Sequence, residues 1–124
     1  MSSNATAVPT EPIHLGAESD LEEAVSTYDV VLVDFYADWC GPCQMMEPAI
    51  ESVAADTDAA VVKVDVDQFQ GLAAQYGVQG IPALFLFADG ETVEQLVGMK
   101  SEDELSGVIE RYTSRPNARP VGPR

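Results

Sequence analysis

The chain has 124 residues and a formal net charge of -15, from 21 acidic and 6 basic side chains. This length predicts a single domain that buries a hydrophobic core without help from disulfides or metals. Nucleic acid is disfavoured as a direct partner, because phosphate binding needs clustered Lys and Arg, and residues 11–113 contain only Lys63, Lys100 and Arg111.

The excess of acid predicts an adaptation to the solvent. With only two lysines and carboxylates on every predicted surface, the composition resembles that of proteins from halophilic organisms, whose cytoplasm is concentrated salt. Concentrated salt screens the repulsion between surface charges to within a few ångströms. The alternative is an ordinary acidic protein that tolerates its own repulsion.

Residues 1–12 are mostly polar, contain two prolines, and have neither a basic run nor an apolar segment of seven residues. We therefore expect a flexible N-terminal arm, with no secretory signal and no membrane-spanning segment. This predicts a cytoplasmic protein that does not bind membranes. In that compartment a single Cys-x-x-Cys motif is more often catalytic than structural.

The first predicted elements lead up to a buried strand. Residues 13–15 fit a short edge strand, where His14 is a surface residue rather than a metal ligand. Ser19 and Glu22 fit a capping box, which predicts a helix over about 20–27. The continuous apolar run 30–36 then predicts a central strand covered on both faces, interrupted only by the carboxyl of Asp34.

Both cysteines lie in Trp39-Cys40-Gly41-Pro42-Cys43, directly after that strand. If the following residues are helical, positions i and i+3 share one face with Cα atoms about 5 Å apart, a separation that a disulfide tolerates. A bridge that closes four residues stabilises by only about 2 kcal/mol, against about 3 for a fifteen-residue loop. The pair is therefore predicted to be a reversible redox switch.

The rest of the chain continues the alternation of strands and helices. A helix with an internal proline, Pro48, is predicted to about residue 55, then a buried strand over 59–66. Asp67 with Gln70 fits the start of a helix that Gly77 ends. This order predicts an α/β fold.

The last part of the chain predicts a hairpin and a final helix. Asp89-Gly90 separates two strand-like runs, 83–88 and 91–97, and is a hairpin turn signal. Ser101 and Glu104 form another capping box before an amphipathic helix. Residues 114–124 hold three prolines and three arginines, which predicts a disordered tail, with a basic docking arm as the alternative.

Several of these motifs together resemble thioredoxin, over about residues 13–112. They are Val33-Asp34-Phe35, Trp39-Cys40-Gly41-Pro42-Cys43, Pro48, Gly80-Ile81-Pro82 and Val97-Gly98. The resemblance implies a thioredoxin domain over about 13–113, with a central mixed sheet of about five strands flanked by about four helices. It also implies reduction of disulfide-containing protein substrates, with electrons from a thioredoxin reductase. We expect a monomer that needs no cofactor and no metal.

The chemistry of the two thiols follows from their predicted places on the helix. Cys40 is expected at the helix N-terminus, where free backbone donors and the helix dipole lower a thiol pKa, so it is the predicted nucleophile. Cys43, one turn deeper, is expected to be more buried and to resolve the mixed disulfide. Gly41 and Pro42 add no charge, which favours a reductant at about -270 mV, as for thioredoxins generally. Two inert core thiols are the alternative.

Asp34 is the predicted proton carrier. Burial in an apolar strand raises the pKa of a carboxyl, so that it exchanges protons near neutral pH. The resemblance assigns Asp34 this role toward Cys43 and places Lys63 beside it as a tuning residue. The alternatives are a strand-end carboxylate that reaches water, and an ordinary surface lysine.

Substrate binding is predicted to rely on backbone and apolar groups. The resemblance implies a cis Ile81–Pro82 peptide bond that faces the disulfide and offers backbone groups to an extended substrate strand. For the tryptophan, a packing role is the alternative. The predicted substrate surface consists of Trp39, Gly41, Pro42, Ile81, Pro82, Val97 and Gly98.

Two positions depart from the family pattern. Gln44 stands where many thioredoxins have lysine, and Ala83 stands where threonine is common. The first change weakens the local positive potential, and the second removes a hydroxyl near the thiols.

Two rival functions stay open from the sequence: a binding or chaperone-like module that does not use its thiols, and an oxidase or isomerase.

Overall fold

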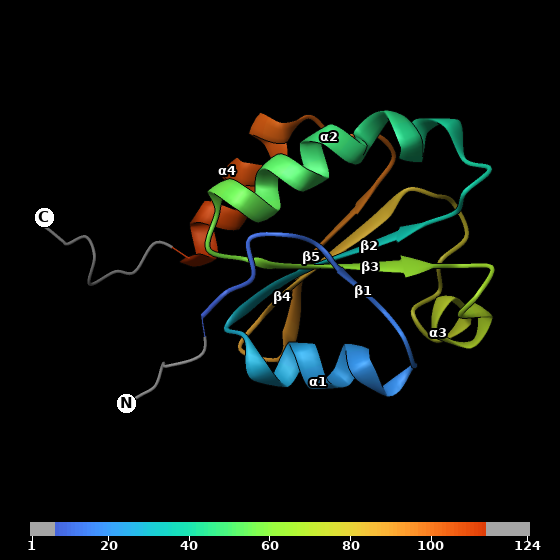
Figure 1. Cartoon of the computed structure of the whole chain (residues 1–124), viewed down its shortest axis with the longest axis horizontal. Coiled ribbons are helices and arrows are strands. Elements are labelled where there is room, and N and C mark those ends of the chain that lie inside the picture. The colour runs from blue at the N-terminus through green and yellow to red at the C-terminus, as the bar shows by residue number, and fades with distance from the viewer. Residues whose placement is uncertain (1–6, 114–124) are drawn as a thin grey trace, which may run out of the picture.

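The computed structural model describes residues 7–113, so residues 1–6, half of the predicted N-terminal arm, and the predicted tail 114–124 lie outside the described residues. Strands and helices alternate along the chain as predicted (Figure 1). The elements are β1 (Ile13–His14), α1 (Ser19–Thr27), β2 (Val30–Tyr36), α2 (Gly41–Asp56), β3 (Ala60–Asp65), α3 (Gln70–Gln75), β4 (Ala83–Ala88), β5 (Glu91–Val97) and α4 (Glu102–Thr113). Over 7–113, none of the helices has the length and apolarity needed to cross a bilayer.

The five strands form one mixed sheet in the order β1-β3-β2-β4-β5. The first three are parallel to one another, and β4 and β5 run antiparallel. Helices α1 and α3 cover one face, and α2 and α4 cover the other (Figure 1). The predicted mixed sheet between helices is confirmed, and β1 lies at its edge with His14 exposed.

Alternation along β2 divides the core into two layers. Val31 and Val33 point toward α1 and α3, whereas Val30 and Leu32 pack against α2 and α4. Successive side chains of a strand point to opposite faces, so Asp34 belongs to the face that α2 covers. The strand is buried from Val30 to Phe35, as the apolar run predicted, and only its last residue, Tyr36, is half-buried.

The residues predicted to end elements do so. Gly77 follows α3 with a φ of 67°, a left-handed conformation that glycine adopts without steric cost. Asp89 and Gly90 both have positive φ, 53° and 86°, as a tight hairpin between β4 and β5 requires.

One capping box is confirmed and another is wrong. The Ser101 hydroxyl accepts from the Glu104 N–H at 3.1 Å, and the Glu104 carboxylate accepts from the Ser101 N–H at 3.0 Å. Helix α1 instead begins after Glu18, with no side-chain cap. There the Asp20 carboxylate accepts from the N–H groups of Gly16 and Ala17, which lie in the preceding turn.

The start of α3 also differs from the prediction. No side chain caps this helix, which begins after Phe69. The carboxylate of Asp67 instead accepts the indole N–H of Trp39. The carboxylate of Asp65 takes the local role, accepting from the N–H groups of Asp67 and Gln68 at 2.9 and 3.4 Å.

Candidate active site

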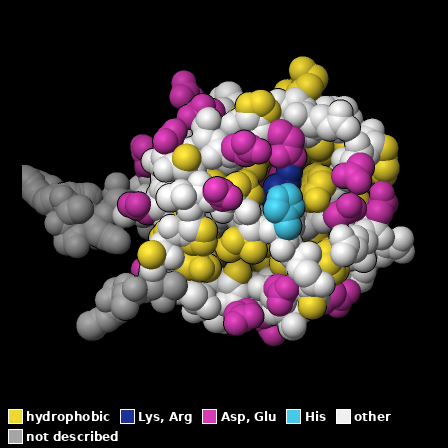
Figure 2. Space-filling view, in the orientation of Figure 1, with side chains coloured by type: hydrophobic (Ala, Val, Ile, Leu, Met, Phe, Trp, Pro, Cys, Tyr) yellow, Lys and Arg dark blue, Asp and Glu magenta, His cyan; other side chains and the backbone are white. Residues whose placement is uncertain are grey.

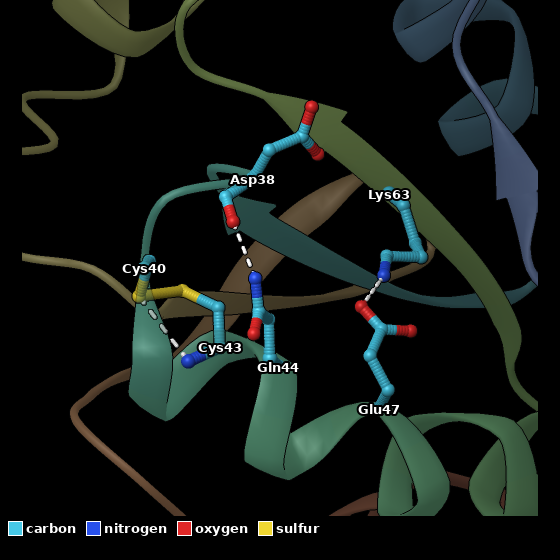
Figure 3. A network of polar contacts seen from close by, with 6 residues as sticks. All are labelled: Asp38, Cys40, Cys43, Gln44, Glu47 and Lys63. Atoms are coloured by element: carbon cyan, nitrogen blue, oxygen red, sulfur yellow. Dashed lines mark hydrogen bonds and ion pairs between the residues drawn. A yellow bond between two sulfur atoms is a disulfide. The ribbon is translucent and has the colours of Figure 1, made fainter.

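The two cysteines lie at the beginning of α2 and form a disulfide (Figure 3). Cys40 is the residue before the first helical position, and its sulfur accepts the N–H of Cys43 at 3.2 Å. This contact satisfies one of the N–H groups that a helix start leaves without a partner. The Cα atoms are 5.2 Å apart, in agreement with the predicted i, i+3 geometry.

Both cysteines are buried, each with 4% of its surface exposed. Gly41 and Pro42, which stand between them, are exposed. Whole-residue exposure therefore does not separate the two sulfurs, and the deeper burial of the Cys43 sulfur stays a prediction.

The segment before β4 lies against the disulfide. The Ile81–Pro82 peptide bond is cis, as the resemblance implies. The Ile81 carbonyl oxygen is 3.9 Å from the Cys40 sulfur. The Pro82 carbonyl accepts the N–H of Gly98 at 2.8 Å, so the end of β5 is joined to the same place. The structure thus brings Cys40, Ile81, Pro82 and Gly98 together, although they are far apart in sequence.

Large apolar side chains are exposed close to these residues in sequence. Trp39, next to the disulfide, has 69% of its surface exposed, and its indole N–H donates to Asp67 Oδ2 at 2.8 Å. Val97, next to Gly98, is 58% exposed. A packing role for Trp39 is wrong, because the indole is held at the surface by a hydrogen bond.

Sequence reasoning missed two exposed methionines that flank the predicted site residues. Met45 is two positions after Cys43, and Met99 directly follows Gly98. Both are exposed, unlike Met46, which is buried in the layer under α2. An exposed methionine is a flexible apolar contact that adapts to different partners. The only signal in the sequence was adjacency to the site.

Asp34 is 4% exposed, which contradicts the alternative of a strand-end carboxylate in water. Burial raises its pKa from 3.8 to about 7. The nearby charge of Lys63 acts in the opposite direction, and the charge of Glu47 raises the pKa further. A carboxyl of this kind exchanges protons near neutral pH.

Lys63 is buried beside Asp34 and is not a surface lysine. The two residues are register partners on the parallel strands β3 and β2. The Lys63 ammonium forms an ion pair with Glu47 of α2 (Figure 3). It also lies 4.3 Å from the centre of the Tyr36 ring. Glu47 was not predicted, because nothing in its local sequence marks it as the partner of a buried cation.

Gln44, which replaces the usual lysine, has a contact of its own. Its side-chain amide donates to the backbone carbonyl of Asp38, across the turn that carries Trp39 and Cys40 (Figure 3). It therefore ties the first turn of α2 to the beginning of the loop that follows β2. The described residues contain no cluster of three or more His, Cys, Asp or Glu that fits a metal ion.

A pair of cysteines three positions apart at a helix start, in contact with a cis-proline loop and carried by a five-stranded mixed sheet, defines a thiol–disulfide oxidoreductase. The family model described as Thioredoxin matches residues 13–111, so the chain belongs to the thioredoxin family.

Relatives of known sequence and structure agree with this assignment. The thioredoxin of Chlamydia caviae is 44% identical over 85 residues, which cover 68% of this chain and 83% of the relative. The thioredoxin of Staphylococcus epidermidis is 41% identical over 97 residues, covering 77% and 92%. A solved mutant thioredoxin from Halobacterium salinarum is 57% identical, has a TM-score of 0.84, and covers 88% of this chain and 96% of its own. Cys40 and Cys43 are therefore the redox-active pair of this chain.

Proposed function

We propose that this chain reduces disulfide bonds in proteins and is itself reduced by a thioredoxin reductase. One observation carries the proposal: Cys40 stands at the N-terminus of α2, with only exposed, uncharged residues between it and Cys43. The helix start favours the thiolate of Cys40, while Gly41 and Pro42 add no charge that would over-stabilise it. This combination favours donating electrons over accepting them.

The reduction proceeds in two exchanges. The Cys40 thiolate attacks one sulfur of the substrate disulfide, forming a Cys40–substrate disulfide and releasing the first substrate thiolate. The Cys43 thiolate then attacks the Cys40 sulfur, which restores the disulfide seen here and releases the second substrate thiolate. The substrate gains two electrons, and the protein loses two. The reductase returns both electrons to the pair.

We infer that Asp34 takes the proton from Cys43 before the second exchange. Its burial on the α2 face and its raised pKa support this role, because the carboxyl is close to half ionised near neutral pH. Lys63 tunes Asp34 through its charge. If Asp34→Asn leaves the pH profile of the reductase-coupled rate unchanged, the role is lost.

Substrates are proposed to bind at the exposed surface around the disulfide. The apolar side chains of Trp39 and Val97 offer contact area that does not depend on substrate sequence. The Ile81 carbonyl, 3.9 Å from the attacking sulfur, is placed to align an extended substrate segment. The Pro82 carbonyl already accepts from Gly98, so it contributes less than its neighbour. The proposed surface consists of Trp39, Gly41, Pro42, Ile81, Pro82, Val97 and Gly98.

A trapping experiment tests the function. Cys43→Ser leaves the nucleophile but removes the resolving thiol, so substrate proteins stay attached through Cys40 and are released by dithiothreitol. Cys40→Ser is the matched control and traps none. Both variants are expected to lose insulin reduction. Equal trapping by the two variants would contradict the proposed roles.

The rival function is a binding or chaperone-like module that does not use its thiols. The Cys40→Ser variant also distinguishes this function from that of a reductant. In cells that lack the native protein, Cys40→Ser fails to restore growth under oxidative stress if the chain acts as a reductant. Restoration by Cys40→Ser would favour the binding module.

We further propose that the protein works as a cytoplasmic monomer of a halophilic organism. Its charge of -15, its two lysines and its similarity to the Halobacterium salinarum thioredoxin support this setting. Figure 2 shows carboxylates spread over one whole face, with little basic surface between them.

We propose a domain over 13–113, with 1–12 and 114–124 as accessory arms. Deletion of 114–124 is expected to leave turnover unchanged.

A further inference from the structure

Three titratable side chains form a row across the parallel part of the sheet. Register pairs His14 of β1 with Lys63 of β3, and Lys63 with Asp34 of β2. Residues paired in adjacent strands point to the same face, and alternation places this row on the face that α2 covers. Glu47, on α2, lies over the middle of the row and pairs with Lys63. Lys63 therefore has two acidic neighbours, Asp34 and Glu47.

The lysine is paired with only one of them. The Lys63 side chain is 3% exposed, and a buried ammonium needs a close anionic partner to offset its lost hydration. Glu47 supplies that partner, with the ring of Tyr36 4.3 Å away as a second contact. Within residues 7–113 Asp34 forms no ion pair, so its carboxyl is buried without a cation in contact.

We propose that Glu47 is a positioning residue for the redox centre, which holds the Lys63 ammonium at α2 and so prevents it from pairing with Asp34. The inference rests on the proposed role of Asp34 as the proton carrier. With Lys63 held by Glu47, Asp34 is not drawn into an ion pair, so its carboxyl can both hold and release a proton near neutral pH. Without Glu47, the ammonium is free to turn to Asp34, its register partner on β2, and Asp34 then ionises at lower pH.

A cavity explains why Glu47 is the preferred partner. A hollow of about 400 Å³ reaches Lys63 and Glu47 from the surface, between α2 and the segment that includes β1. The side chain of Glu47 is 35% exposed, so its carboxylate keeps contact with water while it binds the lysine, which Asp34 cannot do. Figure 2 looks onto this side, with the single histidine beside a basic group and carboxylates around them.

Several other titratable side chains lie around Lys63 and Glu47, and a pH experiment must distinguish their effects from that of Glu47. Lys63 comes from β3, Glu47 and Glu51 from α2, and His14 from β1. Glu11, before β1, lines the same cavity, and Tyr36 on β2 contacts the lysine. Glu51 is an exposed acid one helical turn after Glu47, and it forms no ion pair with Lys63. It is therefore a matched control for the loss of one negative charge at the cavity.

The experiment follows the titration of the Asp34 carboxyl carbon by NMR in the oxidised protein, the state described here, in which neither cysteine titrates. Glu47→Gln is expected to lower the midpoint by about one pH unit, because it removes a negative charge and releases a positive one. Glu51→Gln is expected to leave the midpoint within about 0.2 units. The proposal is overturned if Glu47→Gln leaves the midpoint unchanged, or if both variants lower it equally.

Repeating the experiment in the Lys63→Gln variant distinguishes an effect of Glu47 through the position of Lys63 from a direct effect of the Glu47 charge on Asp34. In Lys63→Gln, removal of Glu47 can act only through its own charge, so Glu47→Gln is expected to lower the Asp34 midpoint by less than half as much as in the native chain. An equal change in the two backgrounds would show that Glu47 does not act through Lys63. The titration does not depend on activity, so failure of the Asp34 role in turnover and failure of the Glu47 role are distinguished.

Discussion

The buried carboxyl of Asp34 makes a quantitative prediction about stability. Its pKa is about 7 in the folded protein and 3.8 in an exposed chain, so folding favours the protonated form. Below pH 3.8 the group is neutral in both states and costs nothing. Between the two values the unfolded chain releases its proton first, so the free energy of unfolding falls as pH rises, and above pH 7 the loss is complete.

Asp34→Asn removes this loss, because the amide has a similar shape and no charge. Each pH unit between the two pKa values corresponds to about 1.4 kcal/mol. The free energy of unfolding of the variant, minus that of the native chain, is therefore expected to be about 4 kcal/mol larger at pH 8 than at pH 4. Partial relaxation of the site would reduce the measured gain to about 3 kcal/mol.

The assay is urea unfolding of the oxidised protein from pH 4 to pH 8, with the variant measured beside the native chain in the same molar KCl. Asp38→Asn is the control for the loss of one acid, because Asp38 is an exposed residue two positions after the end of β2. If the Asp34→Asn difference changes by less than about 1 kcal/mol, the carboxyl is not titrating as a buried group and the reasoning is refuted.

Three further predictions concern capping, salt and substrate contact. Ser101→Ala is expected to lower the free energy of unfolding by about 1 kcal/mol in urea titrations, whereas Ser19→Ala, which removes no cap, stays within about 0.5; equal losses would contradict the capping assignment. The melting temperature is expected to climb steeply from dilute to molar KCl as repulsion is screened, and a flat curve would count against salt adaptation. Trp39→Ala is expected to raise KM for insulin about tenfold with the melting temperature nearly unchanged, and an unaltered KM would remove the indole from the substrate surface.

Much of the fold was predictable because its signals are local. The apolar run of β2, the glycine after α3 and the Asp89-Gly90 turn each depend on residues that are neighbours in sequence. The Cys40–Cys43 geometry was predictable for the same reason, since three residues of helix determine it. Burial of Asp34 followed from its place inside an apolar strand.

The same local patterns failed at two helix starts, once beside a neighbouring acid and once because a distant group bound the side chain. Ser19 fits a capping box as well as Ser101 does, but a carboxylate one residue later satisfies the turn before α1. Asp67 fits a helix cap, but the indole of Trp39 takes its carboxylate across 28 positions of sequence. A pattern over four residues cannot register a partner that arrives only when the sheet and its loops have assembled.

The sequence by itself therefore determined the order of the elements, the redox pair and the presence of a carboxyl in a buried strand. Only the tertiary structure decided what surrounds that carboxyl. Strand register set Lys63 beside Asp34, and the packing of α2 over the sheet brought Glu47 to Lys63. The physical reason is that charges act through space, so the protonation of Asp34 depends on residues that no local spacing connects to it.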